Sequence, residues 1–135
     1  MLFGQEHVDR YRATDGEEGY SWQRGTTILL LTTRGRKSGD ERTTPLIFER
    51  RGDDYLIVAS KGGTDEAPAW YLNLKANPDD VRVQVRGDVF GVRARDATPD
   101  EQPELWRTMT AVWPDYDEYQ KRTARKIPVV VLERA

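Results

Sequence analysis

The chain has 135 residues, enough for one domain with a hydrophobic core and too few for two independent domains. Its net charge of -2 argues against a general nucleic-acid binder, and the absence of cysteine excludes disulfides, thiolate catalysis and cysteine metal sites. The one histidine, His7, lies in a polar N-terminal stretch, so we expect no metal site. No apolar run approaches the roughly 20 residues of a membrane helix, and residues 1–25 lack the apolar core of a signal peptide. We therefore expect a cytoplasmic protein without stable membrane insertion.

Residues 1–25 are polar, and their apolar side chains are too scattered to define one helical face. We interpret them as an N-terminal arm, either a loose segment or a short helix. The pattern changes at residue 26. Residues 27–33 and 43–49 predict two strands paired across a basic turn, and a second turn leads into a strand at residues 55–60.

A helix is predicted to begin beside Pro68 and to end at Ala76, before Asn77 and Pro78. Alternating valines at 81–85 predict a half-buried strand, which turns at Gly87 into another strand at 89–95.

A second helix is predicted to begin with Thr98 as its cap and Glu101 three residues later. It ends at Trp113–Pro114, a short helix follows, and residues 128–132 predict a last strand. The sequence thus predicts one mainly β domain over residues 26–135, a small β-barrel with attached helices of the α+β class.

The basic turn after the first strand has the residue types of an anion site. It carries Arg34, Gly35, Arg36, Lys37, Gly39 and Arg42. Glycine lets backbone N–H groups approach a ligand, while guanidinium and ammonium groups supply charge. The turn is not a Walker loop, and taken alone it supports a solvated hairpin tip as well as it supports a phosphate site.

The loop at residues 59–63 offers a hydroxyl, a cation and exposed backbone N–H groups at the end of a neighbouring strand. It is either an ordinary flexible loop or a second wall of the same cleft. In the helix that follows, Asn73 is placed to hydrogen-bond either a ligand or its own surroundings.

Three aromatic side chains, Trp113, Tyr116 and Tyr119, recur at a spacing of three residues and would share one face if this stretch were helical. They could anchor that helix to the core or line a site for a flat ligand. No catalytic machinery is visible in the sequence, so an enzyme of this kind needs a bound cofactor to carry the reaction.

Together, the stretches 29–39, 42–46, 58–63 and 68–78 closely resemble the deazaflavin-dependent nitroreductase family of actinobacteria, with its F420H2-dependent quinone reductases. The tail from Trp113 to Val129 is similar too, so the resemblance covers residues 26–133. It implies a split β-barrel of the FMN-binding type and the cofactor F420, a 5-deazaflavin with a phosphate and an oligoglutamate tail.

The resemblance also implies roles for individual residues. The phosphate would be held by Arg36, Lys37, Ser38 and Arg42. The deazaflavin ring and its chain would be lined by Thr44, Pro45, Val58, Ala59, Ser60, Lys61, Gly62, Trp70 and Asn73. The substrate would meet Trp113, Tyr116 and Tyr119. Ser60 and Tyr116 would be the catalytic residues, because they could stabilise the anion that develops as reduced F420 delivers hydride from C5 to the acceptor.

We therefore expect an F420H2-dependent reductase of a small electron-poor acceptor: a quinone, an enone or a nitroaromatic. A non-catalytic F420 carrier and a split barrel that uses FMN are the alternatives, and haem is a poorer one. Family members that activate nitroimidazoles typically have tyrosine where Trp113 stands, and a longer amphipathic N-terminal segment. The sequence leaves open the physiological acceptor, nitroimidazole reduction, the role of the arm and whether the chain forms a homodimer.

Overall fold

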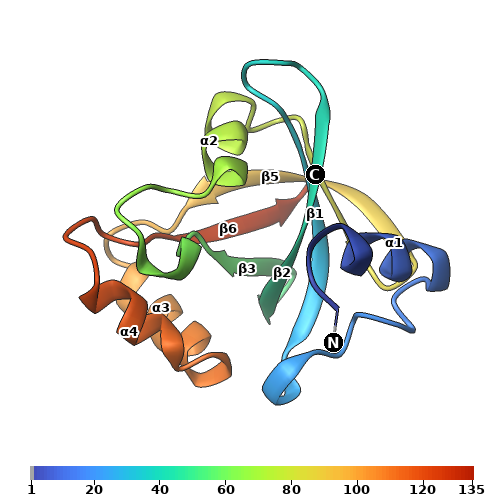
Figure 1. Cartoon of the computed structure of the whole chain (residues 1–135). Coiled ribbons are helices and arrows are strands. Elements are labelled where there is room, and N and C mark those ends of the chain that lie inside the picture. Colours follow the sequence, from blue (N-terminus) through green and yellow to red (C-terminus); the bar gives the residue numbers. More distant parts are fainter. Residues whose placement is uncertain (1) are drawn as a thin grey trace.

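The structure, a computed structural model, describes residues 2–135 and is built around a closed barrel of six antiparallel strands (Figure 1). The strands are β1 (Thr27–Arg34), β2 (Glu41–Arg51), β3 (Asp54–Val58), β4 (Val81–Val85), β5 (Asp88–Asp96) and β6 (Val129–Arg134). Their order around the barrel is β1-β2-β3-β6-β5-β4, and β1 pairs with β4 to close it. The predicted strands and the mainly β barrel are confirmed.

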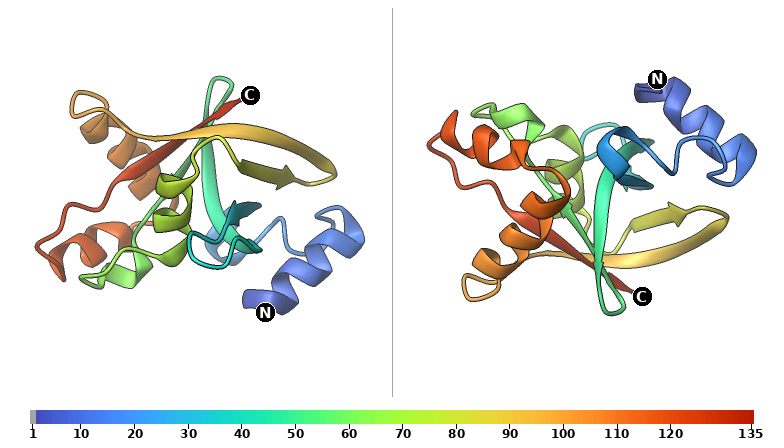
Figure 2. Two further views of the ribbon diagram at one scale, coloured as in Figure 1. Left: turned by 90° about the horizontal axis from the view of Figure 1, so that it is seen from above. Right: turned by 90° about the horizontal axis from the view of Figure 1, so that it is seen from below.

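Within the described residues, four α-helices surround the barrel. They are α1 (Gly4–Thr14), α2 (Ala69–Ala76), α3 (Gln102–Val112) and α4 (Asp115–Lys121), with short 3-10 turns η1 (Gln23–Gly25) and η2 (Lys61–Gly63). Helix α1 lies on one side of the barrel, and α3 and α4 lie together on another (Figure 2). Within residues 2–135, no helix is long and apolar enough to cross a membrane.

The first strand is buried on both faces, which explains its unbroken apolar run. Leu29 and Leu31 belong to the cluster inside the barrel, whereas Ile28 and Leu30 pack against Val8 and Tyr11 of α1. The Tyr11 hydroxyl donates to the Ile28 carbonyl at 2.9 Å. The N-terminal segment therefore carries a docked helix. Its short apolar face was not recognised in the sequence.

Helix α3 covers the outer face of β3 and β6. Its residues Leu105 and Met109 form a second apolar cluster with strand residues and with Trp113 and Tyr116. The predicted cap is present: the Thr98 N–H donates to Glu101 Oε1 at 2.9 Å, and the Glu101 N–H donates to Thr98 Oγ1 at 3.2 Å. Regular helix begins only at Gln102, after this capped turn.

Candidate functional site

Two adjoining cavities lie beside strand β2, and Trp70 of helix α2 belongs to the wall of both. The first, the aromatic cavity, has a volume of about 420 Å³. The second, the basic cavity, has a volume of about 510 Å³. Trp70 is buried because it also packs into the barrel core, so the shared wall is rigidly placed. One elongated ligand could extend from one cavity into the other across this indole.

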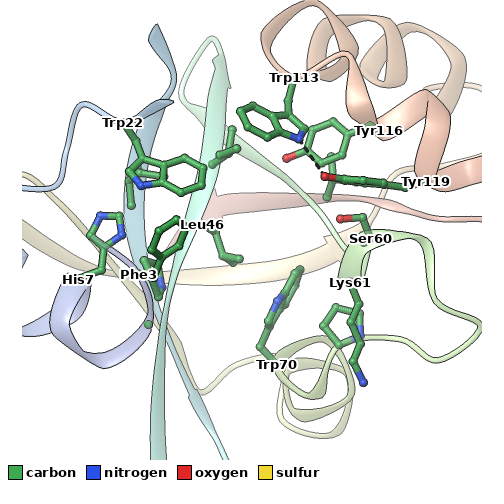
Figure 3. A pocket seen from close by; sticks show the side chains of 17 residues that line it. Phe3, His7, Trp22, Leu46, Ser60, Lys61, Trp70, Trp113, Tyr116 and Tyr119 are labelled. Atoms are coloured by element: carbon green, nitrogen blue, oxygen red, sulfur yellow. Dashed lines mark hydrogen bonds between the residues drawn. The ribbon is translucent and has the colours of Figure 1, made fainter. Parts of the chain in front are cut away.

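The aromatic cavity is formed by elements from both ends of the chain (Figure 3). Its lining includes Phe3, His7, Trp22, Pro45, Leu46, Val58, Ser60, Lys61, Gly62, Trp70, Trp113, Tyr116 and Tyr119. Strand residues contribute to its wall. Trp70 of α2 lies on one side of the cavity, and Trp113, Tyr116 and Tyr119 lie on the other. A concave apolar site with a few polar groups is typical for a flat organic ligand.

Predicted phosphate-binding residues lie around the basic cavity. Arg36, Lys37, Ser38 and Arg42 line it, together with Thr44. Neither Lys37 nor Arg42 forms an ion pair with any residue in the described range 2–135. Both side chains are exposed, so their charges are available to an anion.

One cation of the turn is used differently. Arg34 donates to Asp80 at 2.7 Å and to the Gly39 carbonyl at 2.8 Å, so it fixes the shape of the turn. It does not line either cavity. From the sequence, Arg34 was grouped with Arg36 and Lys37 as a cation of the turn. Its acidic partner, Asp80, lies 46 positions away in the chain, so no local pattern indicated the pairing.

Asn73 connects helix α2 to the basic turn. Its side-chain oxygen accepts from the backbone N–H of Arg36 at 3.2 Å and from Arg36 Nη1 at 2.8 Å. Asn73 is buried and also lines the basic cavity. The side-chain oxygen Oδ1 of Asn73 is therefore committed to the turn, while its side-chain nitrogen Nδ2 has no hydrogen-bond partner among the described residues.

The loop after β3 presents backbone to the aromatic cavity. Lys61, Gly62 and Gly63 all have positive φ, at 46°, 64° and 83°. The Lys61 ammonium lies 3.6 Å from Glu66, so it is the loop's main chain and Ser60 that face the cavity. Ala59, expected beside the cofactor, is fully buried in the barrel core and lines neither cavity.

The aromatic side chains near α4 have distinct hydrogen bonds. Trp113 Nε1 donates to the Tyr119 hydroxyl at 3.3 Å. The hydroxyls of Tyr116 and Ser60 have no partner within residues 2–135, and both residues line the cavity. Burial raises the pKa of Tyr116 well above its ordinary value, so its phenol stays protonated and can donate. Trp113 and Tyr116 pack in the core and also line the aromatic cavity, so their anchoring role is confirmed and their contact with a flat ligand stays a prediction.

The N-terminal segment adds walls that sequence reasoning missed. The rings of Trp22 and Trp113 stack with centroids 5.9 Å apart, and Phe3 meets Trp22 edge-on at 5.7 Å. Arg24 lies 4.1 Å above the Trp113 ring and pairs with Asp115 at 3.0 Å. No periodicity in residues 1–25 indicated the contacts of Trp22 and Arg24 with Trp113, because Trp113 lies about 90 positions away.

Comparisons with known proteins agree with this geometry. The family model for F420H(2)-dependent quinone reductases matches residues 3–134. An F420H(2)-dependent quinone reductase of Mycobacterium tuberculosis is 46% identical over 131 residues, covering 95% of this chain and 87% of that protein. A solved F420-H2 dependent reductase (FDR-A) is 42% identical with a TM-score of 0.71, covering 78% of this chain and 93% of the other.

A second solved relative, described as a domain-swapped dimer, is 38% identical with a TM-score of 0.74 and covers 96% of each chain. More distant structures show the fold alone. A pyridoxamine 5'-phosphate oxidase-like protein of Listeria innocua is 13% identical (TM-score 0.56), and an FAD-binding protein of Mesorhizobium loti is 16% identical (TM-score 0.52). The fold is thus the split β-barrel of flavin-binding proteins. Because the family model and its relatives span nearly the whole chain, this protein belongs to the F420H(2)-dependent quinone reductase family.

Proposed function

We propose that this chain binds F420 and uses its reduced form to reduce a small quinone. The observation that carries the proposal is the pair of cavities, one aromatic and one basic, that share Trp70 as a wall. F420 has the matching form, a flat ring system joined through a chain to a phosphate. The names of the family and of its relatives support the same cofactor and acceptor.

The residues present fit the cofactor. Lys37 and Arg42 would hold the phosphate through charge-assisted hydrogen bonds, with Ser38 and Arg36 beside them. Pro45, Val58 and Trp70 would pack against the ring, and the backbone of residues 60–62 would meet its polar edge. Thr44 and Asn73, which line the basic cavity, would meet the chain between ring and phosphate. The chemistry that F420 supplies is hydride donation from C5 of its reduced form.

The remaining side of the aromatic cavity would receive the acceptor. Trp113 and Tyr119 line this side of the cavity and would contact a planar quinone through their aromatic rings. Hydride addition places negative charge on the quinone oxygen, and the neutral hydroxyls of Tyr116 and Ser60 are free to donate to it. A single such donor contributes about 1.4–2.7 kcal/mol to the transition state, which corresponds to roughly ten- to a hundredfold in rate.

The competing functions fit less well. A carrier needs no free donors beside the ring, whereas Tyr116 and Ser60 lack partners in the described chain and line an open cavity. FMN also has a ring and a phosphate, and the relative affinities for F420 and FMN distinguish the two cofactors. Haem is disfavoured because His7 Nε2 is 2.8 Å from the Gly19 carbonyl and the ring is buried.

Anaerobic kinetics with reduced F420 and a panel of quinones, enones and nitroaromatics test the proposal. We expect oxidation of F420H2 with quinones as the fastest acceptors, and F420 affinity at least about tenfold tighter than FMN affinity, or 1.4 kcal/mol. Binding without turnover would establish a carrier, and equal affinity for FMN would remove the cofactor assignment.

Two further expectations remain proposals. A homodimer is suggested by the relative that crystallised as a domain-swapped dimer, and light scattering would distinguish the 15.5 kDa monomer from twice that mass. A cytoplasmic location stays a prediction from the sequence, to be checked by fractionating the cells that produce the protein.

A further inference from the structure

The guanidinium of Arg125, in the segment between α4 and β6, holds the loop that follows β3. Its Nη1 donates to the Ala59 carbonyl at 3.2 Å, its Nη2 to the Ser60 carbonyl at 2.9 Å, and its Nε to the Thr64 carbonyl at 2.9 Å. Arg125 does not line the aromatic cavity; it borders a separate cavity that Tyr71 also lines. One side chain outside the aromatic cavity thus hydrogen-bonds to both ends of the loop.

These bonds set the direction of the loop's amide groups. In a trans peptide the C=O and N–H point in opposite directions, and the structure has no cis peptide within the described residues. Because the carbonyls of Ala59 and Ser60 point toward Arg125, the N–H groups of Ser60 and Lys61 point away from it. Away from Arg125 lies the aromatic cavity, which Ser60, Lys61 and Gly62 line.

The local conformation gathers these amides into an anion-binding shape. Ser60 has right-handed helical angles (φ -86°, ψ -41°), and Lys61 follows with a φ of 46°. A right-handed residue followed by a left-handed one forms a nest, in which three successive N–H groups converge on an anion or a carbonyl oxygen. Over residues 2–135, the N–H groups of Ser60, Lys61 and Gly62 form no hydrogen bond, whereas those of Gly63 and Thr64 are used within the loop.

Arg125 is itself held in place. Gln120 Nε2 donates to the Arg125 carbonyl at 2.8 Å, and Gln120 Oε1 accepts from the Ile127 N–H at 2.9 Å. Gln120 belongs to α4, the helix that carries Tyr116 and Tyr119. The loop that faces the ring and the helix that faces the acceptor are therefore connected through the segment that bears Arg125.

We propose that Arg125 is a positioning residue, which keeps the N–H groups of Ser60, Lys61 and Gly62 directed into the aromatic cavity. There they would donate hydrogen bonds to a carbonyl or anionic oxygen of the bound deazaflavin. This inference rests on the proposed function. Arg125 touches neither cofactor nor acceptor; it acts by preorganising the loop, so that the backbone need not be ordered on binding.

The test compares Arg125→Ala and Arg125→Lys with Lys126→Ala, which removes the adjacent exposed cation without touching the loop. F420 affinity is measured by fluorescence titration, and thermal melting reports folding. We expect F420 binding weaker by about tenfold in Arg125→Ala, an intermediate loss in Arg125→Lys, and no change in Lys126→Ala.

Guanidinium ion added at a non-denaturing concentration should restore much of the affinity of Arg125→Ala, while urea at the same concentration should not. Backbone amide exchange, followed by NMR, should be faster at Gly63 and Thr64, whose N–H groups are hydrogen-bonded within the loop, in Arg125→Ala than in the wild type before any ligand is added. Should Arg125→Ala fail to fold, Arg125→Lys carries the comparison, since it keeps the charge and the aliphatic stem.

Unchanged F420 affinity in the folded Arg125 variants would overturn the inference, as would equal losses in Arg125→Ala and Lys126→Ala. A wild-type chain that does not bind F420 would instead contradict the proposed function, so the two failures are distinguishable.

Discussion

Gly63 is the point at which the loop after β3 meets helix α4. Its φ is +83°, and a Cβ added there would lie 2.5 Å from the Tyr119 carbonyl oxygen and 2.7 Å from the Tyr119 Cα. Both neighbours are backbone atoms, so no side-chain rotation can relieve the overlap. Gly63→Ala should therefore force η2 and α4 apart.

The magnitude follows from two effects. Positive φ in alanine costs about 1 kcal/mol, and overlap with fixed atoms adds about 1–3 kcal/mol. For a chain of this size, a total of about 2–4 kcal/mol lowers the melting temperature by roughly 6–15 °C. Gly52→Ala is the matched control, because Gly52 has a φ of +61° and open space around its missing Cβ. It should lose only about 1 kcal/mol.

Thermal and urea unfolding of the two variants give the free energies, and F420 titration gives the effect on the site. We expect Gly63→Ala to weaken F420 binding as well, since the loop bearing Ser60 moves with it. Equal destabilisation of both variants would refute this prediction. Backbone strain alone would then account for the loss of stability, and the overlap with Tyr119 would add nothing to it.

Three further predictions concern charge, catalysis and pH. Lys37→Ala or Arg42→Ala should weaken F420 binding by roughly 1.5–3 kcal/mol in a fluorescence titration, with little change in melting temperature because both side chains are exposed; constant affinity with a collapsed melting temperature would make them structural residues. Tyr116→Phe should keep F420 affinity and lower quinone turnover by roughly ten- to a hundredfold; an unaltered rate would assign the ring to packing alone. Arg95, the Thr98 N–H and Arg51 hold the pKa of Glu101 well below its ordinary value of 4.5, so Glu101 stabilises the fold above that pH and loses its effect as the pH falls below it. Glu101→Gln should cost about 1–2 kcal/mol at neutral pH and progressively less in acid, as measured by urea unfolding; a pH-independent difference would contradict this sign.

Strands and turns could be predicted because their signals are local. The alternation of valines at 81–85 and the capping pair Thr98 and Glu101 lie within a few residues of one another, and both appear in the structure. The two loops that frame the site were also recognised, because glycine and basic residues concentrate at the ends of neighbouring strands. What brings these loops together could not be predicted from spacing.

The unpredicted features all depend on partners distant in the chain. Arg34 was grouped with the anion-binding cations, yet Asp80 engages it. Trp22 belongs to the cavity only because Trp113 stacks on it. Arg125 had no local signal at all, since its partners are backbone carbonyls about 65 positions earlier, which are specified by the course of the main chain and not by residue type.

A crystal structure of the chain with F420 bound would show directly whether one cofactor occupies both cavities that share Trp70. We expect the phosphate within hydrogen-bond distance of Lys37 and Arg42, and the deazaflavin ring beside Trp70 and the loop of residues 60–62, with Tyr116 on the open side. A phosphate bound outside the basic cavity, or a ring outside the aromatic cavity, would contradict this expectation.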